Sequence, residues 1–212
     1  VSRNMRAIDL SGKTGVVFGV ANQRSIAWGI SKTLAEAGAE LAFTYLNERL
    51  KKGVEKAVST LGDPVLVECD ATDDDQVIDV YKKAADAMGK IDFVVHCIAF
   101  ADRADLGGEF SATNLAGFRT ALEASAYSLM PVTRHAVPYM PEEGGAVVTS
   151  SFDASRRVFP GYNIMGTAKA ALENEVRQLA NEFGPKNVRV NAVSPGPLAT
   201  LAARSIPGFN TM

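Results

Sequence analysis

The sequence predicts an α/β fold in which a doubly wound parallel sheet carries helices on both faces. Strand-like and helix-like segments alternate along the 212 residues, which is the order typical of this fold class. The segments at residues 91–97 and 145–150 are almost continuously apolar, as central strands buried on both faces are. Chemically distinctive residues follow the strands, and such sheets bind ligands outside the carboxyl ends of their strands.

The individual elements are predicted in order from apolar periodicity and from turn residues. A strand at residues 14–18 leads through a loop to a helix that starts after Ser25, a good N-cap, and ends at Gly38. The charged residues of the last helix are expected to face outward. The other predicted strands cover residues 40–45, 65–69, 91–97, 145–150 and 188–193, and the other predicted helices cover about 47–61, 75–88, 114–139 and 162–183.

Composition narrows the classes of protein and partner that fit this chain. A length of 212 residues suits one domain, and a net charge of −2 gives no case for nucleic acid or a membrane surface as a partner. Cys69 and Cys97 lie in apolar runs, which favours free thiols in a reducing compartment such as the cytoplasm. His96 and His135 lack metal-ligand spacing, and no run of about 18 apolar residues occurs, so we expect a soluble protein without a metal.

A tyrosine and a lysine near the start of the last predicted helix are the candidate catalytic pair. Lys169 follows Tyr162 by seven residues, and a lysine side chain on a helix leans toward the N-terminus, beside the Tyr162 hydroxyl. The ammonium is expected to lower the pKa of the phenol from about 10, which would suit an acid catalyst or oxyanion stabiliser. The pair alone equally allows Tyr162 to cap an apolar face and Lys169 to be a solvated surface charge.

The loop after the first strand is the candidate site for a dinucleotide pyrophosphate. Gly19 precedes a helix that begins near Ser25, and the N-terminus of a helix offers free N–H groups and a positive dipole end. The usual dinucleotide pattern has three glycines, whereas this loop has one before Ser25. An ordinary glycine turn therefore remains the alternative interpretation of this loop.

The ends of the second and third strands bear on the choice of cofactor. The absence of a basic residue at Leu46 and Asn47 favours NADH, while Arg49 leaves NADPH open. Asp70, at the end of the third strand, is a candidate for binding adenine. A turn or helix-capping role for Asp70 is at least as compatible with its position.

Five segments in this order resemble the short-chain dehydrogenase/reductase superfamily, whose fold is of the Rossmann type. Within it, the chain resembles the enoyl-acyl carrier protein reductases of bacterial fatty acid synthesis. Typical members of the superfamily carry the lysine four residues after the tyrosine, where this chain has Gly166, and the longer spacing to Lys169 resembles the enoyl reductases. The matching segments are residues 19–27, 40–45, 95–101, 162–169 and 188–202.

The resemblance implies a role for each matching position. Tyr162 would contact the thioester carbonyl of the substrate, and Lys169 would bridge the hydroxyls of the nicotinamide ribose. The cofactor would be held by Gly19, Ser25, Ile26, Asp70, Ala71, Ala99, Lys169, Pro197 and Thr200. The acyl chain would lie on Phe152, Phe159, Tyr162, Met165, Ile206 and Phe209. For each of these residues other than Tyr162, core packing is the first interpretation.

The chain departs from the family pattern at two places. Phe152 stands where many members have a second tyrosine, and a phenyl ring donates no hydrogen bond, although a mycobacterial branch also has phenylalanine in this neighbourhood. The family also continues past the point that matches Met212. We therefore expect six strands here, a seventh beyond Met212, and one dinucleotide-binding and catalytic domain over residues 1–212 that lacks its C-terminal segment.

The resemblance implies NADH-dependent reduction of trans-2-enoyl groups carried on acyl carrier protein or coenzyme A. It also implies a homotetramer, while the composition favours a cytoplasmic protein with no nucleic acid or membrane partner. Two alternatives remain. Another superfamily reaction, such as 3-oxoacyl reduction, finds serines at Ser150 and Ser151 but the wrong lysine spacing. A non-catalytic dinucleotide-binding sensor would bind NADH without consuming it.

Overall fold

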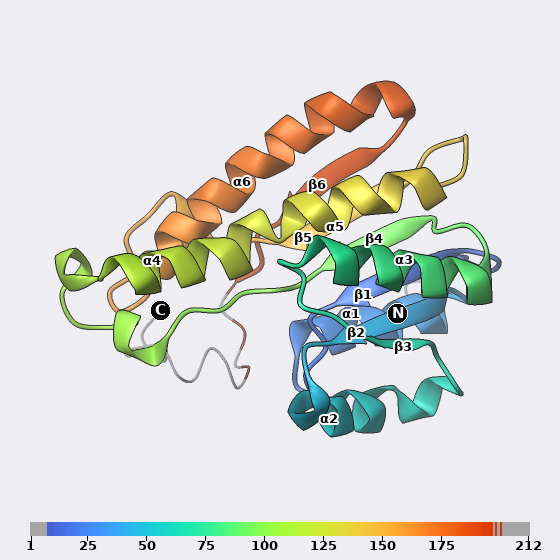
Figure 1. Cartoon of the computed structure of the whole chain (residues 1–212), viewed down its shortest axis with the longest axis horizontal. Helices are drawn as coiled ribbons and strands as arrows, with labels where there is room; N and C mark the ends of the chain where they lie inside the picture. Colours follow the sequence, from blue (N-terminus) through green and yellow to red (C-terminus); the bar gives the residue numbers. More distant parts are fainter. Residues whose placement is uncertain (1–7, 197, 199, 201–212) are drawn as a thin grey trace, which may run out of the picture.

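The computed structural model describes residues 8–196, 198 and 200. These residues form a six-stranded, entirely parallel sheet with the strand order β3-β2-β1-β4-β5-β6 (Figure 1). The chain winds outward from β1 in one direction and from β4 in the other, so the two central strands flank the crevice where doubly wound sheets bind ligands. The predicted fold class is confirmed. The seventh strand expected beyond Met212 lies outside the described residues.

The strands agree closely with the predicted segments. β4 and β3 are shorter than predicted: the N–H of Ile91, predicted to open the fourth strand, donates to the carbonyl of Tyr139 outside the sheet, at 2.9 Å. Register is set between apolar residues, with Val16 of β1 opposite Val94 of β4. The strands are β1 Thr14–Phe18, β2 Glu40–Tyr45, β3 Leu66–Glu68, β4 Phe93–His96, β5 Ala146–Ser150 and β6 Arg189–Val193.

Short polar side chains start several of the helices. Asn47, Asp73 and Asn114 each accept a hydrogen bond from a backbone N–H in the first turn of the helix that follows, at 3.0–3.2 Å. Ser25 also occupies an N-cap position, but its hydroxyl donates to the carbonyl of Asn22, at 2.6 Å, instead of capping the helix. The α-helices are α1 Ile26–Glu36, α2 Glu48–Val58, α3 Asp74–Met88, α4 Leu115–Leu122, α5 Leu129–Ala136 and α6 Ile164–Phe183.

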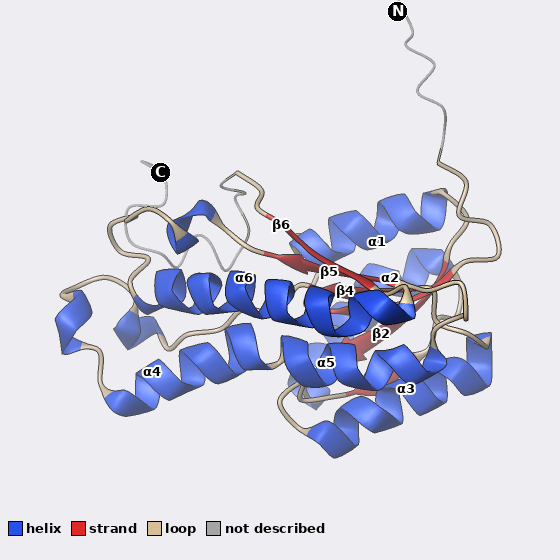
Figure 2. Cartoon of the chain, turned by 90° about the horizontal axis from the view of Figure 1, so that it is seen from above, coloured by secondary structure: helices blue, strands red, loops and turns tan. Residues whose placement is uncertain are grey.

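The helices cover the sheet in two layers, as Figure 2 shows from above. One apolar cluster joins the sheet to α3, α5 and α6, and Tyr81, Leu129 and Leu172 are fully buried in it. The second cluster joins the opposite face to α1 and α2 around Phe43 and Val54. Both faces of the central strands are therefore buried, which explains the continuous apolar sequence of β4.

The long helix predicted at residues 114–139 is interrupted in the structure. α4 and α5 are joined by a π-helical turn, Glu123–Tyr127. The hydroxyl of Ser125 in this turn accepts from the N–H of Phe100 at 2.8 Å and donates to the carbonyl of Phe100 at 3.0 Å. The widened turn thus ties the helix to the segment that leaves β4.

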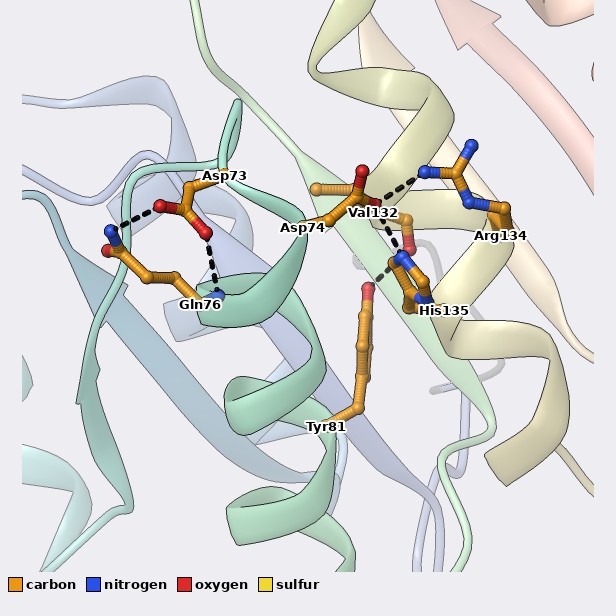
Figure 3. A network of polar contacts seen from close by, with 7 residues as sticks. All are labelled: Asp73, Asp74, Gln76, Tyr81, Val132, Arg134 and His135. Atoms are coloured by element: carbon orange, nitrogen blue, oxygen red, sulfur yellow. Dashed lines mark hydrogen bonds and ion pairs between the residues drawn. The ribbon is translucent and has the colours of Figure 1, made fainter.

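A polar network links α3 to α5 on the face of the sheet that these two helices and α6 cover (Figure 3). The carboxylate of Asp74 accepts from the Arg134 guanidinium and from Nε2 of His135, the latter at 2.5 Å. These contacts, His135 first, lower the pKa of Asp74. Deeper in the layer, the Tyr81 hydroxyl donates to the Val132 carbonyl at 2.7 Å.

In the described part of the chain, no helix is long and apolar enough to span a membrane.

Candidate active site

Lys169 is buried, so the interpretation as a solvated surface charge is wrong. Its side chain is on the inward face of α6 and the residue is only 4% exposed. The ammonium donates to the carbonyl of Ser150, the last residue of β5, at 2.6 Å. Burial lowers the pKa of Lys169 from 10.5 to about 8, and Cys97 and Glu173 offset part of that effect. The ammonium is therefore held at the carboxyl ends of β4 and β5.

Tyr162 lies in the turn that precedes α6, and its ring packs against the ring of Phe152. Its ring centroid is 5.1 Å from that of Phe152, which in turn is 4.9 Å from that of Phe159. Burial raises the pKa of Tyr162 to about 12. The prediction that Lys169 lowers this pKa is wrong, because the ammonium contacts the Ser150 carbonyl and burial dominates. At neutral pH the site offers a neutral phenol that can donate a hydrogen bond.

The turn that carries Tyr162 is held by the loop after β4. Asn163 has a positive φ of 39°, a conformation that favours glycine over residues with a side chain. Its amide donates to the Gly107 carbonyl at 2.5 Å, and the Gly107 N–H donates to the Gly161 carbonyl at 3.0 Å. These bonds compensate for the strained backbone next to the tyrosine. Sequence reasoning missed Asn163, and its place directly after Tyr162 was the available signal.

The glycine loop lies at the crevice between β1 and β4. Gly19 has φ of +100°, and a Cβ there would collide with the carbonyl of Cys97 at the end of β4. Ser25 and Ile26 occupy the N-cap and first position of α1, which has no acidic residue in its first turn. The missing Cβ therefore lets the loop pack closely against the end of β4. The start of α1 favours an anion. These features fit a pyrophosphate despite the missing glycines.

Replacing Gly19 with alanine is expected to destabilise the fold by roughly 2–4 kcal/mol and to weaken NADH binding. The cause is the combination of a positive φ and a collision with backbone atoms that cannot move aside. Thermal unfolding and a fluorescence titration with NADH measure the two effects. Gly29→Ala is the matched control, because a Cβ at Gly29 in α1 meets nothing within 4 Å. The control should gain about 0.5–1 kcal/mol, and equal behaviour of the two variants would contradict the prediction.

Asp70 adopts the turn arrangement that the sequence left open. Its carboxylate accepts from the N–H and the hydroxyl of Thr72, at 2.9 and 2.7 Å. Its own N–H donates to the side chain of Gln76 at 2.8 Å, and Asp73, not Asp70, caps α3. Asp70 still follows β3 at the edge where the other candidate residues gather, so the turn role leaves an adenine contact open.

The other predicted site residues are three cofactor candidates that the structure describes, one acyl-chain candidate in the core, and three residues outside the described part of the chain. Ala71 is buried, Ala99 is exposed after β4, and Thr200 is half-buried. Met165 is 6% exposed, and the Ser125 hydroxyl lies 3.7 Å from its sulfur. Both observations favour the alternative interpretation of Met165 as a core residue. Pro197, Ile206 and Phe209 lie outside the described residues.

Two further polar side chains take part in the site although the sequence did not point to them. His96 bridges Thr149 and Ser128 through its two ring nitrogens, at 2.8 and 2.9 Å, and burial lowers its pKa to about 3, so it is a neutral structural link. Glu173 was expected to face outward with the other charged residues of α6, but its side chain is only 15% exposed. Its place one helical turn after Lys169 was the signal that could have found it.

The strand order, together with a tyrosine and a buried lysine at the carboxyl ends of β4 and β5, defines a protein of the short-chain dehydrogenase/reductase class. A family model described as enoyl-(acyl carrier protein) reductase matches residues 19–212. The chain belongs to this enoyl-(acyl carrier protein) reductase family.

Individual relatives agree with this assignment. The enoyl-[acyl-carrier-protein] reductase [NADH] FabI of Bacillus cereus is 46% identical over 205 residues, which are 96% of this chain and 80% of the relative. The enoyl-[acyl-carrier-protein] reductase [NADPH] FabI of Staphylococcus aureus is 44% identical over 207 residues, 97% of this chain and 80% of the relative. The Bacillus cereus enzyme crystallised with NADP+ and indole naphthyridinone matches with a TM-score of 0.91 at 46% identity, covering 95% of this chain and 79% of that one.

Proposed function

We propose that this chain reduces trans-2-enoyl groups carried on acyl carrier protein, with NADH as the reductant, as a step of fatty acid elongation. The observation that carries the proposal is the combination of a buried ammonium, Lys169, and a neutral phenol, Tyr162, at the carboxyl end of a doubly wound sheet. Membership of the enoyl reductase family and the seven-residue spacing of the pair support it.

Tyr162 is proposed to stabilise the charge that develops on the substrate. When the β-carbon of an enoyl thioester gains a hydride, negative charge moves to the thioester oxygen, which needs a hydrogen-bond donor. The pKa of Tyr162, raised to about 12 by burial, keeps the donor proton on the phenol at neutral pH. Phe152 packs on that phenol ring and offers no second donor. The α-carbon then takes a proton from Tyr162 or from water.

The cofactor is proposed to lie across the crevice between β1 and β4, where its nicotinamide supplies the hydride. The backbone of Gly19 with the start of α1 at Ser25 and Ile26 would hold the pyrophosphate, since the first turn of α1 carries no acidic residue that would repel it. The Lys169 ammonium would hold the nicotinamide ribose hydroxyls. The remaining proposed cofactor contacts are Asp70, Ala71, Ala99, Pro197 and Thr200.

The end of β2 supports NADH over NADPH. Leu46 is 50% exposed and carries no charge, and the side chain of Asn47 is used to cap α2. The ammonium of Lys51 lies 5.4 Å from the centre of the Tyr45 ring, but Glu48 pairs with it at 3.1 Å. A 2′-phosphate would therefore meet a cation whose charge is already partly neutralised, and NADPH is proposed as the weaker cofactor.

The acyl chain and the partner subunits are proposed to meet the chain on separate apolar surfaces. Phe152 and Phe159, beside Tyr162, would contact the acyl chain of a substrate bound to acyl carrier protein or coenzyme A. A homotetramer is proposed to form through α4, α5 and α6. Leu115 and Phe118 of α4 are 63% and 38% exposed and Tyr127 of the π-helical turn is 39% exposed, which supports the first part of this surface. The free thiols of Cys69 and Cys97 support a cytoplasmic location.

Turnover with NADH and a crotonyl or dodecenoyl thioester tests the proposed function. Absorbance of the reduced nicotinamide should fall with either thioester, faster with NADH than with NADPH. A 3-oxoacyl thioester is the matched control and should give little oxidation of NADH. Preference for the 3-oxoacyl substrate would point to another reaction of the superfamily, and NADH binding without any turnover would point to a sensor.

A further inference from the structure

The carboxylate of Glu173 gathers the residues that follow β5. It accepts hydrogen bonds from the hydroxyls of Ser151 and Ser155, both at 2.7 Å, and lies 3.5 Å from the Arg156 guanidinium. Burial alone would raise the pKa of this carboxyl, but the two hydroxyls and the guanidinium lower it below its usual value. Glu173 is therefore ionised at neutral pH, and all three of these partners belong to one loop, the loop that follows β5.

That loop, residues 151–156, follows β5 and leads toward the turn that carries Tyr162. It is here called the anchor loop. It carries Phe152, whose ring packs against the ring of Tyr162. The anchor loop also approaches α6 closely at Gly166, where a Cβ would lie 2.9 Å from the carbonyl of Ala154. A shift of the loop along α6 would therefore move the surface on which the tyrosine ring rests.

Glu173 also lies one helical turn beyond Lys169 on α6. The other titratable groups around the ammonium are neutral at pH 7. Burial lowers the pKa of His96 to about 3 and raises the pKa of Cys97 to about 11. Glu173 is thus the charged group whose field favours the ammonium form of Lys169 at the pH of the reaction.

We infer that Glu173 is a positioning residue, which anchors the loop that supports Tyr162 and holds Lys169 in its ammonium form. The inference rests on the proposed function, because it assigns Glu173 to the same catalytic pair. Its two parts separate chemically. Hydrogen-bond acceptance needs only an oxygen at this position, whereas support of the ammonium needs a negative charge.

Three variants of the whole chain separate these parts. Glu173→Gln keeps an acceptor but loses the charge, so the alkaline fall of kcat, expected near pH 8 in the parent, should move to lower pH. Glu173→Ala loses both, and kcat should fall roughly ten- to hundredfold because the tyrosine is misplaced. Ser155→Ala removes one hydrogen bond and should leave the alkaline fall where it is. Glu182→Gln, at an exposed position near the end of α6, is the matched control and should resemble the parent.

Amide hydrogen exchange over residues 151–163 measures how well Glu173 holds the anchor loop in place, and it requires no turnover. Exchange should accelerate in Glu173→Ala, less in Ser155→Ala, and not in Glu182→Gln. Unchanged exchange in Glu173→Ala overturns the anchoring role, and an unmoved alkaline limb in Glu173→Gln overturns the electrostatic role. If the parent shows no turnover, the proposed function fails on its own. The pH dependence of NADH binding then replaces that of kcat, and should Glu173→Ala not fold, Glu173→Gln and Ser155→Ala still decide the inference.

Discussion

Replacing Lys169 with methionine is expected to abolish turnover and at the same time to stabilise the cofactor-free protein. A pKa lowered from 10.5 to about 8 means that burial opposes the ammonium by roughly 3 kcal/mol at neutral pH. Methionine fills a similar volume without a charge, although it leaves the Ser150 carbonyl without its partner, which costs about 1–2 kcal/mol. The net gain should raise Tm by roughly 2–8 °C at pH 7, measured by calorimetry.

The gain in stability should depend on pH in a direction that the lysine sets. Because the pKa of Lys169 is lower in the folded protein than in the unfolded chain, the penalty is complete below pH 8 and disappears as pH rises from about 8 to 10.5. The Tm difference between parent and variant should therefore shrink across this range. Lys82→Met, at an exposed position of α3, is the matched control and should change stability by less than about 0.5 kcal/mol. A Lys169→Met protein less stable than the parent at pH 7 would contradict this account.

Replacing Tyr162 with phenylalanine is expected to lower kcat by roughly 100- to 1,000-fold, the usual effect of removing one donor from an oxyanion site. The phenyl ring keeps its packing on Phe152, so the fold should be unchanged. The affinity for NADH should also change little, because the proposed ribose contact belongs to Lys169. Steady-state kinetics with an enoyl thioester, together with an NADH titration, measure both quantities.

A matched phenol-to-phenyl change away from the site controls for the loss of a hydroxyl. Tyr139→Phe, whose ring packs on Tyr81 at a centroid distance of 6.2 Å, should leave kcat within about twofold of the parent. If Tyr162→Phe retained nearly full kcat, the stabilising donor would have to be another group, and the role proposed for the phenol would be lost.

The order of strands and helices could be predicted because both depend on local apolar patterning. β1 and β2 fall on the predicted residues, and Asn47 and Asp73 lie where short polar side chains cap helices. The gathering of candidate residues at one edge of the sheet also follows from parallel strands alone. Tyr162 and Lys169 were found in this way, since Tyr162 lies in the turn that follows β5 and Lys169 lies in the first half of α6.

What the sequence could not supply depends on contacts between distant segments. The pKa of Tyr162 is governed by burial among Phe152 and its neighbours, which outweighs a lysine seven residues away. Glu173 lies on the same face of α6 as Lys169 by spacing, but its engagement requires the fold of the anchor loop. Ser25 shows that residue type alone does not decide even a local contact. Serine suits an N-cap, but its hydroxyl donates to the nearby Asn22 carbonyl instead.

The π-helical turn between α4 and α5 has a consequence for how this chain tolerates a change in length. A π-helical turn bonds i to i+5 where an α-helix bonds i to i+4, so deleting one residue from Glu123–Tyr127 would narrow the turn to α-helical geometry and leave the phase of α5 largely unchanged. The contacts of α5 with Tyr81 and Asp74 should then persist, whereas Ser125 should lose its hydrogen bonds to Phe100. A one-residue deletion should thus be tolerated by the helices and be felt at the segment that leaves β4.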